Sequence, residues 1–120
     1  MKILMFAYEK PAHETEIGNT TKDIQKILSS NDIDIVLLHD VSIAIVSSLY
    51  LTLGKSGEVL YNKTFIDKDH RVRHTAIGDF FICGFDKETC SLTSLAPKIM
   101  EQLKKDCQDP DVTHILLDNI

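Results

Sequence analysis

The feature that most constrains the fold is an apolar run from position 80 to 85. Side chains along a strand alternate between the two faces of a sheet. A strand with one face in water would carry a polar residue at every second position, but this run is apolar at all of them. We therefore predict a strand buried on both faces at the centre of the core. The two faces would hold Phe80, Ile82 and Gly84, and Phe81, Cys83 and Phe85.

The chain has 120 residues, which is the length of one domain. Hydrophobic residues make up 43%, a share that favours a folded protein over a disordered one. A chain of this size buries roughly two-thirds of its unfolded surface, so one core can be stable without metal or disulfides. We expect a single domain over residues 1–120, with residues 108–120 as an edge strand or a docking extension.

Two helices are expected. The first opens after Gly18, where Asn19 or Thr20 can cap the free amides of its first turn. The second runs from about residue 94 to 106, with Thr93 or Ser94 as its cap, because Pro97 is tolerated only in the first turn.

Alternating or continuous apolar residues predict the strands. Segment 66–75 is expected to be an exposed loop, and segment 89–93 an irregular stretch that leads into the second helix. Segment 47–53 is expected either to extend a strand or to be irregular. The pattern predicts an α+β fold: a mainly antiparallel sheet of about four to six strands with two helices packed on it. The expected strands are 3–8, 13–17, 33–38, 41–46 and 80–85, with 58–65 as a strand or an irregular arm.

Charge and cysteine content narrow the function. The formal net charge is −5, whereas domains that clamp nucleic acid usually carry a basic surplus, so direct nucleic-acid binding is not favoured. Cys83, Cys90 and Cys107 form an odd set without a Cys-x-x-Cys motif, which indicates reduced thiols and a cytoplasmic location. No run of about 18 apolar residues exists, so we expect no membrane span.

The segment richest in basic residues is the first place to look for a partner. Its charges lie beside Tyr61 and Phe65, and binding residues tend to lie on loops held by a rigid scaffold. Asp67 and Asp69 dilute the positive charge, so an ordinary solvated loop remains the alternative. The candidate partner-binding residues are Lys63, Lys68, His70, Arg71, Arg73 and His74.

Signals for chemistry are weak. Gly54-Lys55-Ser56 lacks the second glycine that a phosphate-binding loop needs. His70 and His74 are four residues apart, and this spacing brings both rings to one side only on a helix. The pattern of this segment predicts a loop, so we do not expect the two histidines to bind a metal together. We expect no metal and no cofactor.

Two further patterns involve histidine. The pair His39-Asp40 is expected to be a tight turn. Cys90 would act as a nucleophile only with a histidine beside it, from among His39, His70 and His74.

The chain resembles a family of small uncharacterised proteins, a domain of unknown function carried by bacterial phages, plasmids and conjugative elements. The resemblance covers about residues 3 to 105. It departs at Asp79 and Cys83, where the family has Thr and Val, and at Lys63, where it has Arg. The shared features are Ile24-Gln25, the acidic turn His39-Asp40, Gly54-Lys55, Asn62-Lys63, the strand 78–84 and Ser91-Leu92-Thr93.

This resemblance implies an accessory protein of a mobile element and no particular reaction. We expect a non-enzymatic binding module, a counter-defence inhibitor of the anti-CRISPR or antirestriction kind, acting on a host protein or nucleoprotein. The alternative is a small enzyme or a protein that sequesters a nucleotide or other small molecule in a pocket near Cys90 and the histidines. The apolar tail segment Ile115-Leu116-Leu117 is as compatible with a homodimer interface as with a place in the core.

Overall fold

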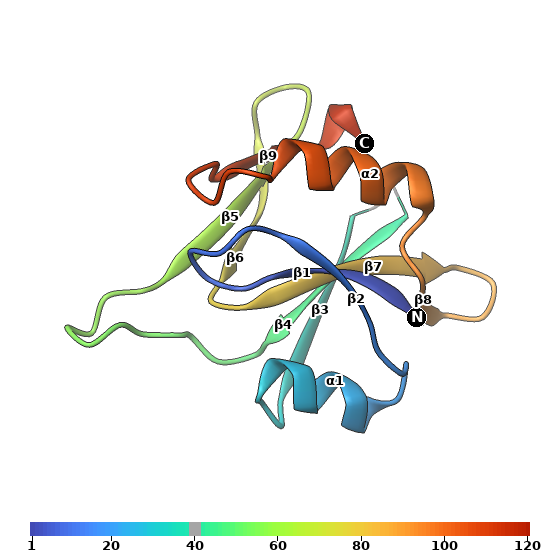
Figure 1. The fold of residues 1–120 in the computed structure, drawn as a ribbon, viewed down its shortest axis with the longest axis horizontal. Coiled ribbons are helices and arrows are strands. Elements are labelled where there is room, and N and C mark those ends of the chain that lie inside the picture. The colour runs from blue at the N-terminus through green and yellow to red at the C-terminus, as the bar shows by residue number, and fades with distance from the viewer. Residues whose placement is uncertain (39–41) are drawn as a thin grey trace.

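The structure is a computed structural model that describes residues 1–38 and 42–120, and Figure 1 shows its fold. Within these residues the chain forms nine strands, two α-helices and a terminal 3-10 helix. The α+β prediction is confirmed. In chain order the elements are β1 (Lys2–Phe6), β2 (His13–Glu16), α1 (Thr21–Leu28), β3 (Ile33–Leu38), β4 (Ile43–Ser48), β5 (Tyr61–Ile66), β6 (Val72–Ile77), β7 (Phe80–Asp86), β8 (Ser91–Thr93), α2 (Pro97–Asp106), β9 (His114–Leu116) and η2 (Leu117–Asn119).

The larger sheet has six strands, and β7 lies at its centre. Its order is β2-β1-β7-β4-β3, and β8 pairs with the far end of β7. All of these pairings are antiparallel. Ile82 marks the middle of the sheet, because it lies opposite Leu4 on one side and Ile45 on the other.

Strand β7 is covered on both faces, as its sequence predicts. Phe80, Phe81, Ile82 and Cys83 are fully buried. Phe81 and Cys83 belong to the cluster that packs under α1, whereas Phe80 and Ile82 belong to the cluster under α2 and the second sheet. In Figure 1, α1 lies on one side of the larger sheet and α2 lies on the other.

The second sheet has three strands in the order β6-β5-β9, and β9 runs parallel to β5. It contributes Phe65 and Ile115 to the cluster that contains Phe80. The rings of Phe6 and Phe80 stack at 4.7 Å between centroids, and Phe65 meets Phe80 edge-on at 6.1 Å. The tail therefore contributes an edge strand, β9, to the second sheet, and the short helix η2 follows it.

The two helix starts have different origins. Thr20 caps α1 as predicted, because its Oγ1 accepts the amide hydrogen of Asp23 at 3.2 Å. Helix α2 begins later than predicted, at Pro97, after Ala96, which offers no side-chain cap. Ser94, one of the expected caps, instead accepts the amide hydrogen of Lys2 at 2.8 Å and ties α2 to β1.

Two loop predictions were wrong. Segment 66–75 contains the turn of a hairpin and most of its second strand, β6, which pairs with β5. Segment 89–93 ends in β8, which pairs with β7. The β3–β4 hairpin is confirmed, while the turn proposed for His39-Asp40 lies outside the described residues.

Gly84 shows why a strand at this position needs a residue without a side chain. A Cβ atom built there would lie 2.5 Å from the carbonyl oxygen of Ser94 and 2.7 Å from Oγ1 of Thr93. The segment that leads into α2 therefore crosses β7 at backbone distance. Among the described residues, no helix is long and apolar enough to cross a membrane.

We expect Phe80→Ala to lower the free energy of unfolding by about 3–5 kcal/mol, because it removes the ring that joins the two sheets. Tyr61→Ala, which removes a ring that is 64% exposed, should change it by less than about 0.5 kcal/mol. Urea unfolding followed by circular dichroism measures both. Equal effects of the two substitutions would contradict the central role of Phe80.

Candidate functional site

The basic segment predicted as a partner site is a β-hairpin, β5–β6, with a tight turn at its tip. Oδ1 of Asp67 accepts the amide hydrogens of Asp69 and Arg71, each at 2.9 Å, and closes the turn. These bonds, with that of Arg71 the largest contribution, lower the pKa of Asp67. Lys68, His70 and Arg71 are exposed at the tip, and Arg73 lies 3.8 Å from Asp67.

Lys63 is not part of this surface. Its side chain is buried, and its residue is only 4% exposed. Nζ donates to the carbonyl oxygens of Pro110 and Val112, which lie in the loop before β9. Lys63 therefore holds the C-terminal segment against β5 and is not available to a partner in this conformation.

The neighbouring Asn62 is also structural. Its Nδ2 donates to the carbonyl oxygen of Phe6 at 3.1 Å and to that of Gly78 at 2.8 Å. It thereby joins the end of β1 to the turn between β6 and β7. The pair Asn62-Lys63 connects three parts of the chain that are distant in sequence, which is a structural reason for both residue types.

His74 lies half-buried on β6, at the junction of the two sheets. Its ring is tilted against that of Phe65, with 6.3 Å between centroids, and its Nε2 has no hydrogen-bond partner among the described residues. Burial lowers the pKa of His74, and the carboxylate of Asp34 offsets part of this effect. The imidazole is therefore neutral at neutral pH.

The cysteines do not gather with the histidines of the hairpin. Cys90 lies in the turn between β7 and β8, on the opposite side of Figure 1 from the β5–β6 hairpin, and its thiol donates to the carbonyl oxygen of Lys87 at 3.7 Å. Burial raises the pKa of Cys83 to about 12 and that of Cys107 to about 11, so both stay protonated. No cluster of metal-ligating residues occurs within residues 1–38 and 42–120.

An exposed apolar segment, Leu49–Leu53, is the surface feature that the sequence pattern did not predict. Its large side chains are between 55% and 64% exposed. In sequence they come directly after β4 and its two final serines, so they resemble a strand extension. No local signal could have found it, because consecutive apolar residues also occur in the doubly buried strand β7. The exposed side chains are Leu49, Tyr50, Leu51 and Leu53.

This segment is held in place by hydrogen bonds. The amide of Leu49 donates to the carbonyl oxygen of Asp32 at 2.9 Å, and the amide of Tyr50 donates to Oγ of Ser48 at 3.2 Å. A side-chain hydrogen bond with Asp32 raises the pKa of the Tyr50 hydroxyl. Further along, the amide of Leu60 donates to the carbonyl oxygen of Thr52 at 3.0 Å.

The residues that follow, 53–59, form a narrow ribbon. Leu53 pairs with Val59, and the amide of Gly54 donates to the carbonyl oxygen of Glu58 at 2.8 Å. The tip includes Gly57, whose φ of 80° suits a residue without a side chain. The ribbon reaches away from the body of the protein at the left of Figure 1, so the apolar segment is presented rather than covered.

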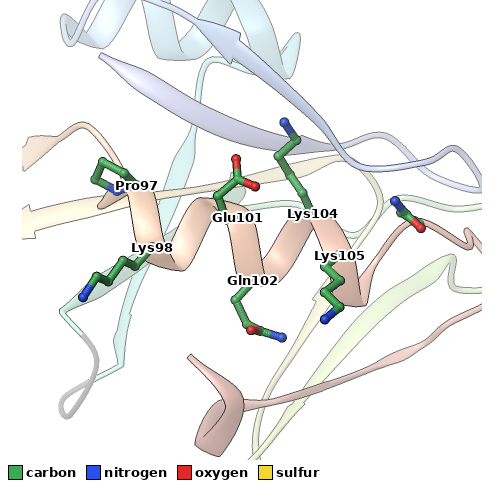
Figure 2. Close-up of a pocket in the computed structure, with 7 residues that line it drawn as sticks. Pro97, Lys98, Glu101, Gln102, Lys104 and Lys105 are labelled. Carbon is green, nitrogen blue, oxygen red and sulfur yellow. The ribbon is translucent and has the colours of Figure 1, made fainter.

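A depression of about 610 Å³ follows the outer face of α2, and Figure 2 shows its lining. Every lining residue comes from α2 or the residues just after it. Lys104 points to one side of the helix, whereas Gln102 and Lys105 point to the other. The side chains do not converge on a common point, which is typical of a solvated helix face.

A second pocket, of about 370 Å³, lies between the ends of β3, β4 and β7. It is mostly apolar, with one lysine. Cys90 reaches it only indirectly, through its bond to the backbone of Lys87. The lining residues are Leu37, Leu38, Ser42, Ile43, Phe85 and Lys87.

Comparison with known proteins places this fold in a family. Residues 1–108 match the model of a domain of unknown function, DUF3846. The chain belongs to this family. No curated protein and no solved structure matches it. The DUF3846 match ends before β9, so it covers the whole six-stranded sheet and both α-helices but not the strand that Lys63 holds in place.

We expect Lys63→Met to lower the free energy of unfolding by about 1–3 kcal/mol, because it leaves the carbonyl groups of Pro110 and Val112 without their donor. Lys68→Met, at the exposed tip of the same hairpin, should change it by less than about 0.5 kcal/mol. Chemical denaturation measures both values. A Lys63→Met protein as stable as the wild type would show that the buried ammonium group contributes nothing to the fold.

We also expect His74 to make stability depend on pH. Its pKa is lower in the folded than in the unfolded state, so the folded state resists protonation. The stability is fully present above the unfolded value of about 6.5 and is lost as the pH falls through the folded value. Between about pH 8 and about pH 5, His74→Gln should therefore lose less stability than the wild type. His13→Gln, at an exposed position on β2, should follow the wild type; identical pH profiles for all three would contradict the assignment.

Proposed function

We propose that this protein is a non-enzymatic binding module that docks on another protein through the apolar segment Leu49–Leu53. The observation that carries the proposal is the exposure of Leu49, Tyr50, Leu51 and Leu53, each more than half accessible. Scattered apolar residues on a surface are ordinary, but a contiguous exposed set marks an interaction site. Leucine and tyrosine supply apolar contact area, and the tyrosine hydroxyl adds a directional bond.

Order in the segment strengthens this proposal. Backbone bonds fix Leu49 and Thr52, and the amide of Tyr50 donates to Oγ of Ser48. A segment that is already in place loses less conformational entropy when it binds. The charged hairpin tip, with Lys68, His70 and Arg71, would then act as a polar contact that guides association rather than as the main source of affinity.

The biological setting that we propose is a bacterial mobile genetic element. Family resemblance supports it, because similar small proteins are carried by phages, plasmids and conjugative elements. Within that setting the module would inhibit a host defence protein or nucleoprotein by covering one of its surfaces. The net charge of −5 favours a protein surface of the partner over its nucleic acid.

The experiment compares two variants that disable different surfaces. Protein carrying Tyr50→Ser and Leu51→Ser is immobilised beside the wild type, and bound host proteins are quantified by mass spectrometry. We expect recovery of the specific partner to fall at least about tenfold, equivalent to 1.4 kcal/mol. The matched control carries Arg71→Glu and Arg73→Glu in the hairpin and should lose less. If only the control variant lost the partner, the hairpin and not Leu49–Leu53 would be the binding site.

The counter-defence role has a separate readout. Phage plating on a strain with an active restriction or CRISPR system should rise when the wild type is expressed, and should not rise with the Tyr50→Ser, Leu51→Ser variant. The same phage on a strain without the defence system is the control. Unchanged plating with the wild type against a panel of such systems would remove this role while leaving protein binding intact.

One observation favours a second candidate, a protein that sequesters a small amphipathic ligand. The 370 Å³ pocket combines the apolar side chains of Leu37, Ile43 and Phe85 with the cationic Lys87. Its volume lies at the lower end of the range for ligand sites. A ligand at a hundredfold excess over its dissociation constant stabilises the folded state by about 2.7 kcal/mol, so thermal-shift screening with nucleotides and small acids detects it. A shift that Lys87→Met abolishes would support this candidate.

A further inference from the structure

The two outer strands of the six-stranded sheet differ in character. At one edge, β2 carries exposed His13, Glu14 and Glu16, and charged side chains at an edge prevent pairing with other chains. At the other edge, β3 contains a single charged residue, Asp34, and exposes Ile35 and Leu37, each at 47%. Strand β3 therefore lacks the usual protection against edge-to-edge pairing.

The backbone of β3 is also available for pairing. The bond from the Leu49 amide to the Asp32 carbonyl makes these two residues a hydrogen-bonded pair of the β3–β4 ladder. Such pairs alternate with non-bonded pairs along an antiparallel ladder. By this alternation Ile33, Ile35 and Leu37 direct their amides and carbonyls outward. None of these outward groups has a partner among the described residues.

We propose that β3 is a homodimerisation edge, where it pairs antiparallel with β3 of a second copy of this chain. A twofold axis through Ile35 places Ile35 against its own copy and Ile33 against Leu37 of the other copy. Every outward amide then meets an outward carbonyl, and the exposed apolar side chains cover one another.

The same register avoids a charge conflict. Asp34 lies opposite Val36 of the second copy, so the two carboxylates are not directly opposed. This self-complementarity is the reason for choosing a second copy over an unrelated strand. The charges on β2 also block head-to-tail growth, so the pairing closes as a dimer and does not extend into a filament. The interface uses residues other than Leu49–Leu53 and does not depend on the proposed function.

Solution mass tests the proposal. Light scattering and sedimentation at several concentrations should give twice the 13.5 kDa of one chain for the wild type. With Ile35→Lys and Leu37→Lys the dissociation constant should rise at least about tenfold. Leu116→Lys is the matched control, since Leu116 is 45% exposed on β9, an edge strand of the other sheet, and it should leave the dimer intact. A monomeric wild type, or a dimer that survives the double substitution, would overturn the proposal.

Amide exchange gives a second test that needs no variant. In the dimer the amides of Ile33, Ile35 and Leu37 are hydrogen-bonded, so NMR-detected hydrogen exchange should slow at these positions, at least about tenfold, as protein concentration rises. The amides of β2, at the charged edge, serve as the internal control and should not change. Concentration-independent exchange at Ile35 and Leu37 in the wild type would overturn the pairing even if a dimer forms elsewhere.

Discussion

The fold depends on burial of β7 from both sides. This strand and its neighbours separate two layers, with α1 on one face and α2 and the second sheet on the other. Phe81 belongs to one layer and Phe80 to the other, so successive residues of one strand hold the whole arrangement together. The larger sheet is a single layer with part of the core packed on each face. A substitution in β7 therefore disturbs the packing of both parts of the core.

Polar ties complete what the apolar clusters begin. Asn62 joins β1 to the β6–β7 turn, and Lys63 joins β5 to the loop before β9. A buried ammonium group is costly unless it is hydrogen-bonded, and here two backbone carbonyls accept hydrogen bonds from Lys63. In sequence the pair Asn62-Lys63 looks like a polar recognition motif, but in the structure both residues hold the second sheet in place. The two interaction surfaces that we propose, Leu49–Leu53 and the β3 edge, use other residues.

The distribution of apolar surface follows from these ties. Strands β1, β4 and β7 are enclosed, and all of their apolar residues except the half-buried Phe85 are buried. The exposed apolar residues of Leu49–Leu53 and of β3, where they are Ile35 and Leu37, lie just beyond the enclosed region. The best candidates for a functional surface are therefore the exposed apolar residues that lie next to the core, rather than the segment with the most charges. The proposed partner binding at Leu49–Leu53 and the proposed self-pairing at β3 are compatible, since they use different residues.

The sequence by itself determined the elements whose signals are local. Continuous apolar residues identified β7 as doubly buried, a threonine followed by an amphipathic turn located α1, and alternation identified the β3–β4 hairpin. Segment 66–75 was misassigned because its many charges resemble a loop, and only pairing with β5 makes β6 a strand. Tertiary structure alone decided that Lys63 is buried, that His74 lies between sheets, and that Leu49–Leu53 has no cover. The physical reason is that burial depends on which distant segments pack against a residue, and nothing in its immediate sequence records that.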